Sequence, residues 1–425
     1  MNLRLIPIVA FTAVLLPAQS ARDHWVATWT TGQLLAHLPA PGGGRGRGGA
    51  RGGAPKNDDP AQAIAAHGFS HQTVRMIAHT SIAGRRLRIK LENAFGGAPV
   101  MVGSAHVALR EKDSAIVTAS DRALAFNGKP GVTIPPGAAI LSDAVDFQVP
   151  ARADLAISLY FPGETGAPTL HINALHNTYI SQEGDATGAA SIDNAIVTQS
   201  SYFLAAVDVA APANAFLLVA FGDSITDGHF ATNEANADWP DVLAVRLAAN
   251  KQTANIAVGN QGINGNRVLR DNTGVNALAR FDFDVLGQAG VKWMTLLEGV
   301  NDIGRAKNRP ADAVTADELI AGYKQIIERA HAHGIKVIGC TITPDEGYAL
   351  YWTEEGEKVR EAANEWIRSG GAFDAVVDFD KATRDAADPK RLAPNFDSGD
   401  HLHPNDAGYK AMGDAFDIAI LARNK

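Results

Sequence analysis

The chain contains a single cysteine, Cys340, among its 425 residues. One cysteine excludes an intramolecular disulfide and a zinc site built on two or four thiolates, so the fold cannot depend on either kind of cross-link. Charged residues are also few, at 20%, and the formal net charge is −8. A chain without a strong positive field is poorly suited to bind nucleic acid or an anionic membrane, so we expect neither as a partner.

Long apolar segments are lacking beyond the first twenty residues. A short basic start precedes the apolar run Leu5 to Pro17, and small residues then lead to a cleavage point near Ser20. The run is too short to span a bilayer, and the pattern is typical of a secretory signal peptide. We therefore predict a signal peptide over residues 1–20 and a secreted or periplasmic bacterial protein without a membrane span.

Residues 21–210 lack helical periodicity and are predicted to form an all-β domain. In the segment 86–92, Leu87, Ile89 and Leu91 alternate with charged residues, which is the period-two pattern of a half-buried strand. Turn clusters rich in Gly, Pro and Asn recur along the region. We expect a β-sandwich or jelly-roll-like accessory domain. The charged face of segment 86–92 is expected to be solvated, with binding of an acidic ligand as the alternative.

Inside this region, residues 41–59 form a low-complexity segment that is almost purely Gly and Arg between residues 42 and 53. Such a composition cannot bury a core, so the segment predicts a disordered surface loop. Arg-Gly-Gly repeats also occur in RNA-binding proteins, but no aromatic residue is interleaved here and the protein is expected to be exported. A role in RNA binding is therefore not favoured.

Residues 211–425 alternate apolar strands with helices. The run Ala215–Phe221 fits a strand buried on both faces, and Trp239–Asn250 fits a helix with proline in its first turn. Five such units predict an α/β fold with a doubly wound parallel sheet. The other predicted strands are 255–258, 291–297, 335–341 and 375–379, and the other predicted helices are 275–286, 316–333, 354–369 and 406–421.

A serine follows the first buried strand directly, in the sequence F-G-D-S-I-T-D-G over residues 221–228. At the carboxyl end of a strand and the start of a helix, Ser224 would have an exposed Oγ and a free N–H, which suits a nucleophile. The G-x-S-x-G elbow of ordinary α/β-hydrolases occurs nowhere in the chain. A serine that merely caps a helix is the alternative.

Asp400 and His403 lie three residues apart, just before the last predicted helix. A nucleophilic serine needs a base to take its proton and an acid to orient that base, and an Asp and a His on one loop can do both. His401 is a competing base, but its position next to Asp400 predicts that its side chain points elsewhere, towards the pocket rim. A metal site of a phosphoesterase, with Asp223 and Asp227 as further ligands, is the alternative.

Two further loops, 260–266 and 298–302, follow the second and third predicted strands. Gly265 allows close approach of the backbone, and Asn301 carries an amide donor. Acyl transfer builds an oxyanion that needs such donors, and the N–H of Ser224 would be a third. In a flavodoxin-like strand order, 2-1-3-4-5, the loops after the first three strands meet at the point where ligands bind. The sequence therefore predicts one shared site.

The blocks G-D-S-I-T-D-G, N-G-N, G-V-N-D and D-H-L-H, in this order, resemble the four motif blocks of the SGNH (GDSL) hydrolases. The likeness covers about Ala215 to Ala422, although N-G-N replaces the family's S-G-D-type turn. It implies a flavodoxin-like catalytic domain over residues 211–425 and a serine esterase that needs no cofactor and no metal. The implied roles are nucleophile for Ser224, base for His403, orienting acid for Asp400, and oxyanion donors for Ser224, Gly265 and Asn301.

Three shorter segments, 239–241, 364–368 and 397–400, resemble a secreted bacterial branch called xylanase-operon-E-like, which carries an N-terminal β domain and is linked to deacetylation of plant polysaccharide. We therefore expect an esterase that releases short acyl groups, acetyl foremost, from small-molecule or polysaccharide esters. Aryl-esterase, lipase and thioesterase activities stay open, as does an inactive carbohydrate-binding protein. Nothing in the sequence indicates an oligomeric state.

Overall fold

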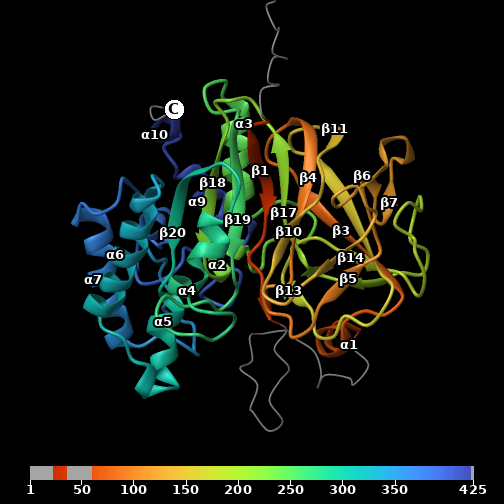
Figure 1. The fold of residues 1–425 in the computed structure, drawn as a ribbon. Helices are drawn as coiled ribbons and strands as arrows, with labels where there is room; N and C mark the ends of the chain where they lie inside the picture. Colours follow the sequence, from red (N-terminus) through yellow and green to blue (C-terminus); the bar gives the residue numbers. More distant parts are fainter. Residues whose placement is uncertain (1–22, 36–59, 423–425) are drawn as a thin grey trace, which may run out of the picture.

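The computed structural model describes residues 23–35 and 60–422. Antiparallel sheets make up the first part of the chain, and a parallel sheet with helices makes up the second part (Figure 1). The predicted signal peptide, 1–20, and the predicted Gly/Arg-rich loop, 41–59, lie outside the described residues. Among the helices that the structure describes, none is long and apolar enough to cross a bilayer.

The first region is rich in strands, as predicted. Its two larger sheets contribute to one apolar core, to which β4 brings Leu87 and Ile89, β3 brings Val74 and β12 brings Leu155. One sheet contains β1 (Trp25–Thr30), β17 (Leu204–Ala210), β4 (Gly84–Glu92), β10 (Ala139–Leu141) and β11 (Val145–Val149). The other contains β15 (Ile196–Thr198), β14 (Thr178–Ile180), β3 (Gln72–His79), β12 (Asp154–Phe161), β6 (Ser104–Lys112), β7 (Ala115–Ile116) and β8 (Arg122–Ala123).

Smaller elements complete this region. The sequence did not predict the helix α1 (Pro60–His67), because eight residues rich in alanine show no clear helical period of apolar and polar residues. The short strands are β2 (Leu34–Leu35), β13 (Thr169–His171) and β16 (Ser201–Tyr202) in one sheet, and β5 (Val100–Val102) with β9 (Val132–Ile134) in another. The finer description as a β-sandwich or jelly roll stays a prediction.

Strand β1 connects the two regions. It pairs with β17 on one side and packs beside the parallel sheet on the other, so it lies in the middle of the molecule (Figure 1). The N–H of Ala27 donates to the carbonyl of Ala289 at 3.0 Å, and Thr30 Oγ1 donates to the carbonyl of Asn260 at 3.2 Å. The two regions therefore share a hydrogen-bonded seam.

The charged face of segment 86–92 is covered, which corrects the expectation of a solvated face. Lys90 and Glu92 are buried, and Lys90 Nζ donates to the carbonyl of Gly287 in the second region at 3.3 Å. Arg88 stacks on the ring of Trp25, 4.5 Å from its centroid. Alternation predicts the strand correctly, but it cannot reveal that a second region covers the polar face.

The second region holds a five-stranded parallel sheet in the order β19-β18-β20-β21-β22, which is 2-1-3-4-5 along the chain. Gly222 at the end of β18 aligns with Gly262 of β19 and with Leu297 of β20, so the carboxyl ends of these three strands lie level. The strands are β18 (Phe216–Gly222), β19 (Ile256–Gly262), β20 (Val291–Leu297), β21 (Lys336–Cys340) and β22 (Ala375–Val377).

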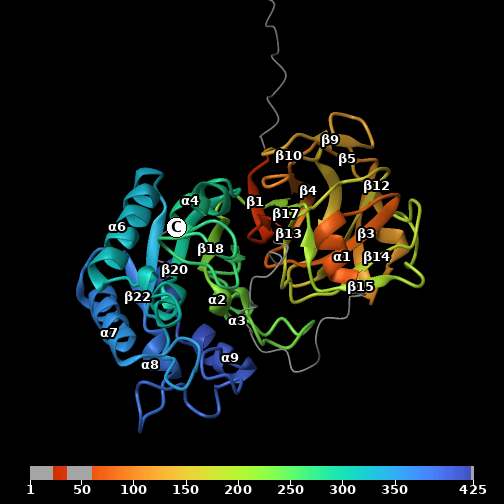
Figure 2. The ribbon, with the colours of Figure 1, turned by 90° about the horizontal axis from the view of Figure 1, so that it is seen from below.

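Helices cover both faces of this sheet, as predicted. Leu218 and Ala220 of β18 pack into one apolar layer, and Leu217 and Val219 pack into the other. Helices α3 (Trp239–Ala249) and α9 (Asp406–Asp414) lie on the first side, and α4 (Ala277–Phe281), α6 (Ala316–Ala332) and α7 (Glu354–Ser369) lie on the second (Figure 2). The remaining helices are α2 (Ser224–Asp227), α5 (Val300–Gly304), α8 (Phe379–Thr383) and α10 (Ala419–Ala422).

Two predicted elements differ in extent. The helix expected over 406–421 is divided into α9 and α10, because Arg246 of α3 donates to the carbonyls of Gly413 and Phe416 that would otherwise continue the helix. The strand expected over 255–258 continues to residue 262, because pairing with β18 extends that far. Residues 260–262, expected in a loop, are therefore in a strand.

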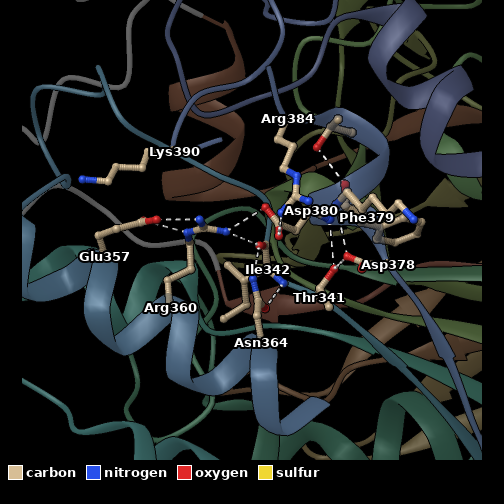
Figure 3. A network of polar contacts seen from close by, with 12 residues as sticks. Thr341, Ile342, Glu357, Arg360, Asn364, Asp378, Phe379, Asp380, Arg384 and Lys390 are labelled. Carbon is tan, nitrogen blue, oxygen red and sulfur yellow. Dashed lines mark hydrogen bonds and ion pairs between the residues drawn. The ribbon is translucent and has the colours of Figure 1, made fainter. Parts of the chain in front are cut away.

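A buried polar network holds the segment after β21 against α7 (Figure 3). Arg360 pairs with Glu357 at 2.7 Å and with Asp380 at 3.1 Å, and it also donates to the carbonyl of Ile342 at 3.0 Å. Asn364, one turn further along α7, donates to the same carbonyl at 2.8 Å. The network therefore fixes where the chain leaves the sheet before residues 345–352.

We expect Arg360→Met to lower the free energy of unfolding by about 3–5 kcal/mol, because it leaves the buried carboxylate of Glu357 without a cation. The matched control is Lys390→Met, which removes only an exposed cation 3.9 Å from Glu354 and should change stability by about 0.5 kcal/mol or less. Urea unfolding followed by tryptophan fluorescence measures both. Equal urea midpoints for the two variants would show that the network contributes no more to the free energy of unfolding than the exposed pair does.

Candidate active site

Ser224 lies where β18 ends and α2 begins, as the sequence predicts. Asp223 caps this short helix, and its carboxylate accepts a hydrogen bond from the N–H of Ile225 at 3.0 Å. Gly222 is required before it, because a Cβ there would lie 2.6 Å from the carbonyl oxygen of Leu297 and closer still to Thr226. The tight turn places Ser224 on the wall of a cavity.

Ser224, His403 and Asp400 form a continuous hydrogen-bonded chain. Ser224 Oγ lies 2.9 Å from His403 Nε2, and His403 Nδ1 lies 2.6 Å from Asp400 Oδ2. The other oxygen of Asp400 accepts hydrogen bonds at 2.9 Å from the N–H groups of Leu402 and His403. Burial opposes ionisation of Asp400, but the contacts with His403 and these N–H groups hold its pKa well below the usual range. Asp400 is therefore an anion at neutral pH.

His401 points away from this chain. Its Nδ1 lies 2.6 Å from Asp397 Oδ2, and its side chain is 55% exposed. The expectation that it diverges from Asp400 agrees with this position, but the expectation that it lines the pocket rim does not, because His401 is not among the residues around the cavity. The backbone of His401, with φ of 69°, turns its side chain outwards.

Gly265 and Asn301 line the same cavity as Ser224 and His403. This cavity has a volume of about 450 Å³. Gly265 adopts φ of 78°, a conformation that favours glycine. Asn301 Oδ1 accepts a hydrogen bond from the hydroxyl of Tyr351 at 2.9 Å, and its Nδ2 is buried without a partner. The amide therefore keeps an unused donor. The other lining residues are Leu34, His171, Ile172, Asp227, His229, Phe230, Asn264, Thr273, Arg305, Tyr348, Leu350 and Leu402.

Arg280 of α4 holds the three loops of the site together and was not predicted. It donates to the carbonyls of Gly222 and Gln261 at 2.8 Å each, and to Asn266 Oδ1 at 2.8 Å. It also contacts Glu298 at 3.1 Å. The guanidinium thus reaches the ends of β18, β19 and β20 at once. No local pattern marks this residue, because its partners are scattered along the chain.

Several carboxyl groups are buried beneath the site. Burial, with the nearby charge of Asp302, raises the pKa of Asp223 to about 7. Burial and Asp223 raise the pKa of Glu298 well above its usual range. Arg280 is the cation that stabilises the ionised forms of Asp223 and Glu298. Arg280 is itself buried, and its guanidinium carbon lies 4.0 Å from the centroid of the Phe221 ring.

His171 of β13 brings the first region into the site and was also not predicted. Its Nδ1 lies 2.7 Å from the carbonyl of Gly32, and its Nε2 lies 3.0 Å from Asp227 Oδ1. The second oxygen of Asp227 accepts the N–H of Asn264 at 3.0 Å, immediately before Gly265. Burial would lower the pKa of His171, but Asp227 raises it above its ordinary value. A histidine of the β region thus braces the Gly265 turn through Asp227.

His229 lies next to His403, the candidate general base, and the centroids of the two rings are 4.6 Å apart. Burial and His403 lower the pKa of His229 to about 4. His229 is therefore uncharged at neutral pH, and it does not oppose a positive charge on its neighbour.

The two histidines considered as metal ligands diverge. His401 contacts Asp397, whereas His403 contacts Asp400 and Ser224. Over residues 23–35 and 60–422, no group of three or more His, Cys, Asp or Glu side chains is placed to share a metal ion. The alternative of a metal centre at this loop finds no ligand set there.

Residues 220–411 match the GDSL-like lipase/acylhydrolase family. No curated protein matches the chain in sequence. Among solved structures, the chain is similar to an acetylxylan esterase from Geobacillus stearothermophilus, with 22% identity, a TM-score of 0.38, and coverage of 48% of this chain and 94% of the other. A GDSL-like lipase from Bacteroides thetaiotaomicron has 22% identity and a TM-score of 0.35, covering 48% of this chain and 87% of the other.

The matched segment contains Ser224, Gly265, Asn301, Asp400 and His403, so the family match and the hydrogen-bonded chain fall on the same residues. Residues 220–411 are therefore a domain of the GDSL-like lipase/acylhydrolase family, and the protein is a carboxylic ester hydrolase.

Proposed function

We propose that the protein is a serine esterase in which Ser224 attacks the ester carbonyl, His403 acts as the base and Asp400 orients it. The single observation that supports this most is the chain of 2.9 Å and 2.6 Å contacts from Ser224 Oγ through His403 to Asp400. With the Nδ1 proton donated to Asp400, the Nε2 lone pair faces the serine hydroxyl. This is the arrangement that a triad requires.

In the first half-reaction, His403 Nε2 takes the proton of Ser224 as Oγ attacks the carbonyl carbon. His403 then returns that proton to the leaving alcohol oxygen, which leaves an acyl group on Ser224. Water repeats the sequence in the second half-reaction, with His403 again as the base, and releases the acid. The ionised Asp400 stabilises the imidazolium, and the neutral His229 next to it adds no opposing charge.

The oxyanion would be stabilised by the N–H groups of Ser224 and Gly265 and by Asn301 Nδ2. The contact from the Tyr351 hydroxyl to Asn301 Oδ1 supports this role, because it leaves the amide nitrogen as the group without a partner. A buried donor that no protein atom satisfies is suited to an oxygen that develops charge only during the reaction.

We further propose a short acyl group, acetyl foremost, on a small ester or a plant polysaccharide. Resemblance of the motif segments to a polysaccharide-deacetylating branch supports this substrate class, and the tyrosine rings of Tyr348 and Tyr351 in the cavity wall provide amphipathic surfaces for a sugar. The chain has no long apolar lid segment of the kind a true lipase would use. The signal-peptide pattern over residues 1–20 supports secretion.

Exposed apolar side chains at the cavity favour one second candidate, an aryl-esterase. Ile172, Phe230 and Leu350 line the cavity and are 48%, 42% and 40% exposed. An aryl alcohol could rest on them, and the reaction at Ser224 would be the same.

We expect kcat/KM to be highest for 4-nitrophenyl acetate, lower for the butyrate and lowest for the octanoate. Acetylated xylan should release acetate in the same preparation. Initial rates for the three chromogenic esters, together with acetate release from the polymer, measure this preference. A higher kcat/KM for the octanoate would instead identify a lipase, and cleavage of aryl acetates without release from xylan would favour the aryl-esterase.

We expect Ser224→Ala and His403→Ala each to lower kcat by a factor on the order of 10⁶, because either change removes the proton-transfer chain. Asn301→Ala should cost a factor of about 10²–10³, as for one lost oxyanion donor. His401→Ala is the matched control for His403→Ala, and it should retain most of the wild-type kcat because its side chain pairs with Asp397 outside the cavity. An inactive His401→Ala with an active His403→Ala would show that the base is wrongly assigned.

We expect His171→Ala to lower kcat by a factor on the order of 10–100, because it removes the partner of Asp227 that braces the Gly265 turn. His171→Gln retains a donor and should lose less. His106→Ala is the control, since His106 pairs with Asp121 at 2.9 Å in the same region but lines no part of the cavity. Wild-type kcat for a folded His171→Ala would mean that the β region does not affect catalysis.

A further inference from the structure

We propose that Arg305 binds a carboxylate of the substrate, so that the preferred esters carry a negative charge close to the bond that is broken. This inference rests on the proposed function, because it places the carboxylate on the ester that Ser224 attacks. Two sources share this chemistry: an acid group on the alcohol part, as in an acylated acidic sugar, or a second acid group on the acyl part.

The charges around the cavity leave Arg305 uncompensated. Of the described residues that line the cavity, Arg305 is the one Arg or Lys and Asp227 is the one carboxylate. Asp227 is already paired with His171 at 3.0 Å. Burial raises the pKa of Tyr351 to about 12, so the neighbouring phenol stays neutral and provides no counter-charge. The cavity therefore has one free positive charge.

Arg305 also lacks the carboxylate partner that three other arginines near the site have. Arg267 and Arg270 both pair with Asp312, at 3.0 Å and 3.3 Å, and Arg280 pairs with Asp284 at 2.7 Å. Arg305 forms no ion pair with any of the residues described, and its Nε is buried without a hydrogen-bond partner. A partly buried guanidinium without an anion is costly, and a bound carboxylate would relieve that cost.

Neutral neighbours hold the side chain in place without cancelling its charge. The guanidinium carbon lies 5.6 Å from the centroid of the Tyr351 ring. With its amide oxygen turned towards Arg305, Asn272 accepts a hydrogen bond from Nη2 at 3.0 Å. Both contacts orient the guanidinium, and neither supplies the negative charge with which an arginine forms its strongest hydrogen bonds.

The position of Arg305 on its helix places the charge next to the reacting ester. Arg305 follows Asn301 by four residues, at the end of α5, and both residues line the cavity. Residues four apart in a helical segment are about 5–6 Å apart at Cβ. An ester whose carbonyl oxygen reaches Asn301 would therefore bring a nearby substituent to Arg305.

The test compares matched charged and neutral esters. For the alcohol part, 4-acetoxybenzoate is compared with its methyl ester, and for the acyl part, mono-4-nitrophenyl succinate is compared with 4-nitrophenyl methyl succinate. We expect the wild-type protein to have a lower KM for the charged member of at least one pair. Arg305→Gln should reduce the charged-to-neutral ratio of kcat/KM by a factor of about ten or more, and Arg305→Lys should retain part of it.

Arg309→Gln is the matched control, because Arg309 is an exposed arginine four residues further on that does not line the cavity. It should leave the ratio unchanged. Added salt should reduce the wild-type preference, as for any exposed or partly exposed charge pair. The pair that responds identifies the part of the substrate that carries the acid group.

Two failures can be told apart. If 4-nitrophenyl acetate is hydrolysed but Arg305→Gln changes the charged and neutral esters equally, the carboxylate site is wrong, and Arg305 instead supports Tyr351 and Asn301. If no ester is hydrolysed by the wild-type protein, the proposed function itself is wrong.

Discussion

The buried guanidinium of Arg280 holds three separate parts of the chain in one place. It donates to Gly222 just before the nucleophile candidate, to Gln261 and Asn266 around the second loop, and to Glu298 at the start of the third loop. Parallel strands bring their carboxyl ends to one edge, but they leave the following loops without regular partners. One cation with five donors satisfies several of these groups at once. The spacing of the candidate oxyanion donors depends on this side chain, although Arg280 is not among the residues lining the cavity.

A second tether comes from the β region. His171 contacts Asp227, and Asp227 in turn accepts a hydrogen bond from the N–H of Asn264. The Gly265 turn is therefore held both by Arg280, through Asn266, and by a residue of the β region. The cavity wall has the same mixed origin, because Leu34, His171 and Ile172 belong to the first region. The active-site candidate is thus built by both halves, and a description of the β region as an accessory domain understates its contribution.

Local patterns were enough to predict the α/β half and the residues that meet in it. Buried strands are visible as apolar runs, and the strand-to-helix turn at Ser224 is visible because serine follows such a run directly. His403 and Asp400 could be paired because they share one loop. Arg280 and His171 could not be predicted, because their partners are scattered along the sequence and one arginine or histidine forms no motif. The prediction that the face with Lys90 and Glu92 is solvated was wrong for a related reason. The alternation of apolar and charged residues does not show which surface packs against another region.

Strand β1 has a consequence for the order in which the molecule is made. It begins at Trp25, pairs with β17 and contacts β19, so it contributes to both halves although both partners follow it far along the chain. The strands of the parallel sheet are synthesised after β1 and β17, so the edge strand β19 packs against a strand that was made much earlier. Until β19 has been synthesised, one side of β1 therefore lacks the strand against which it packs in the folded protein.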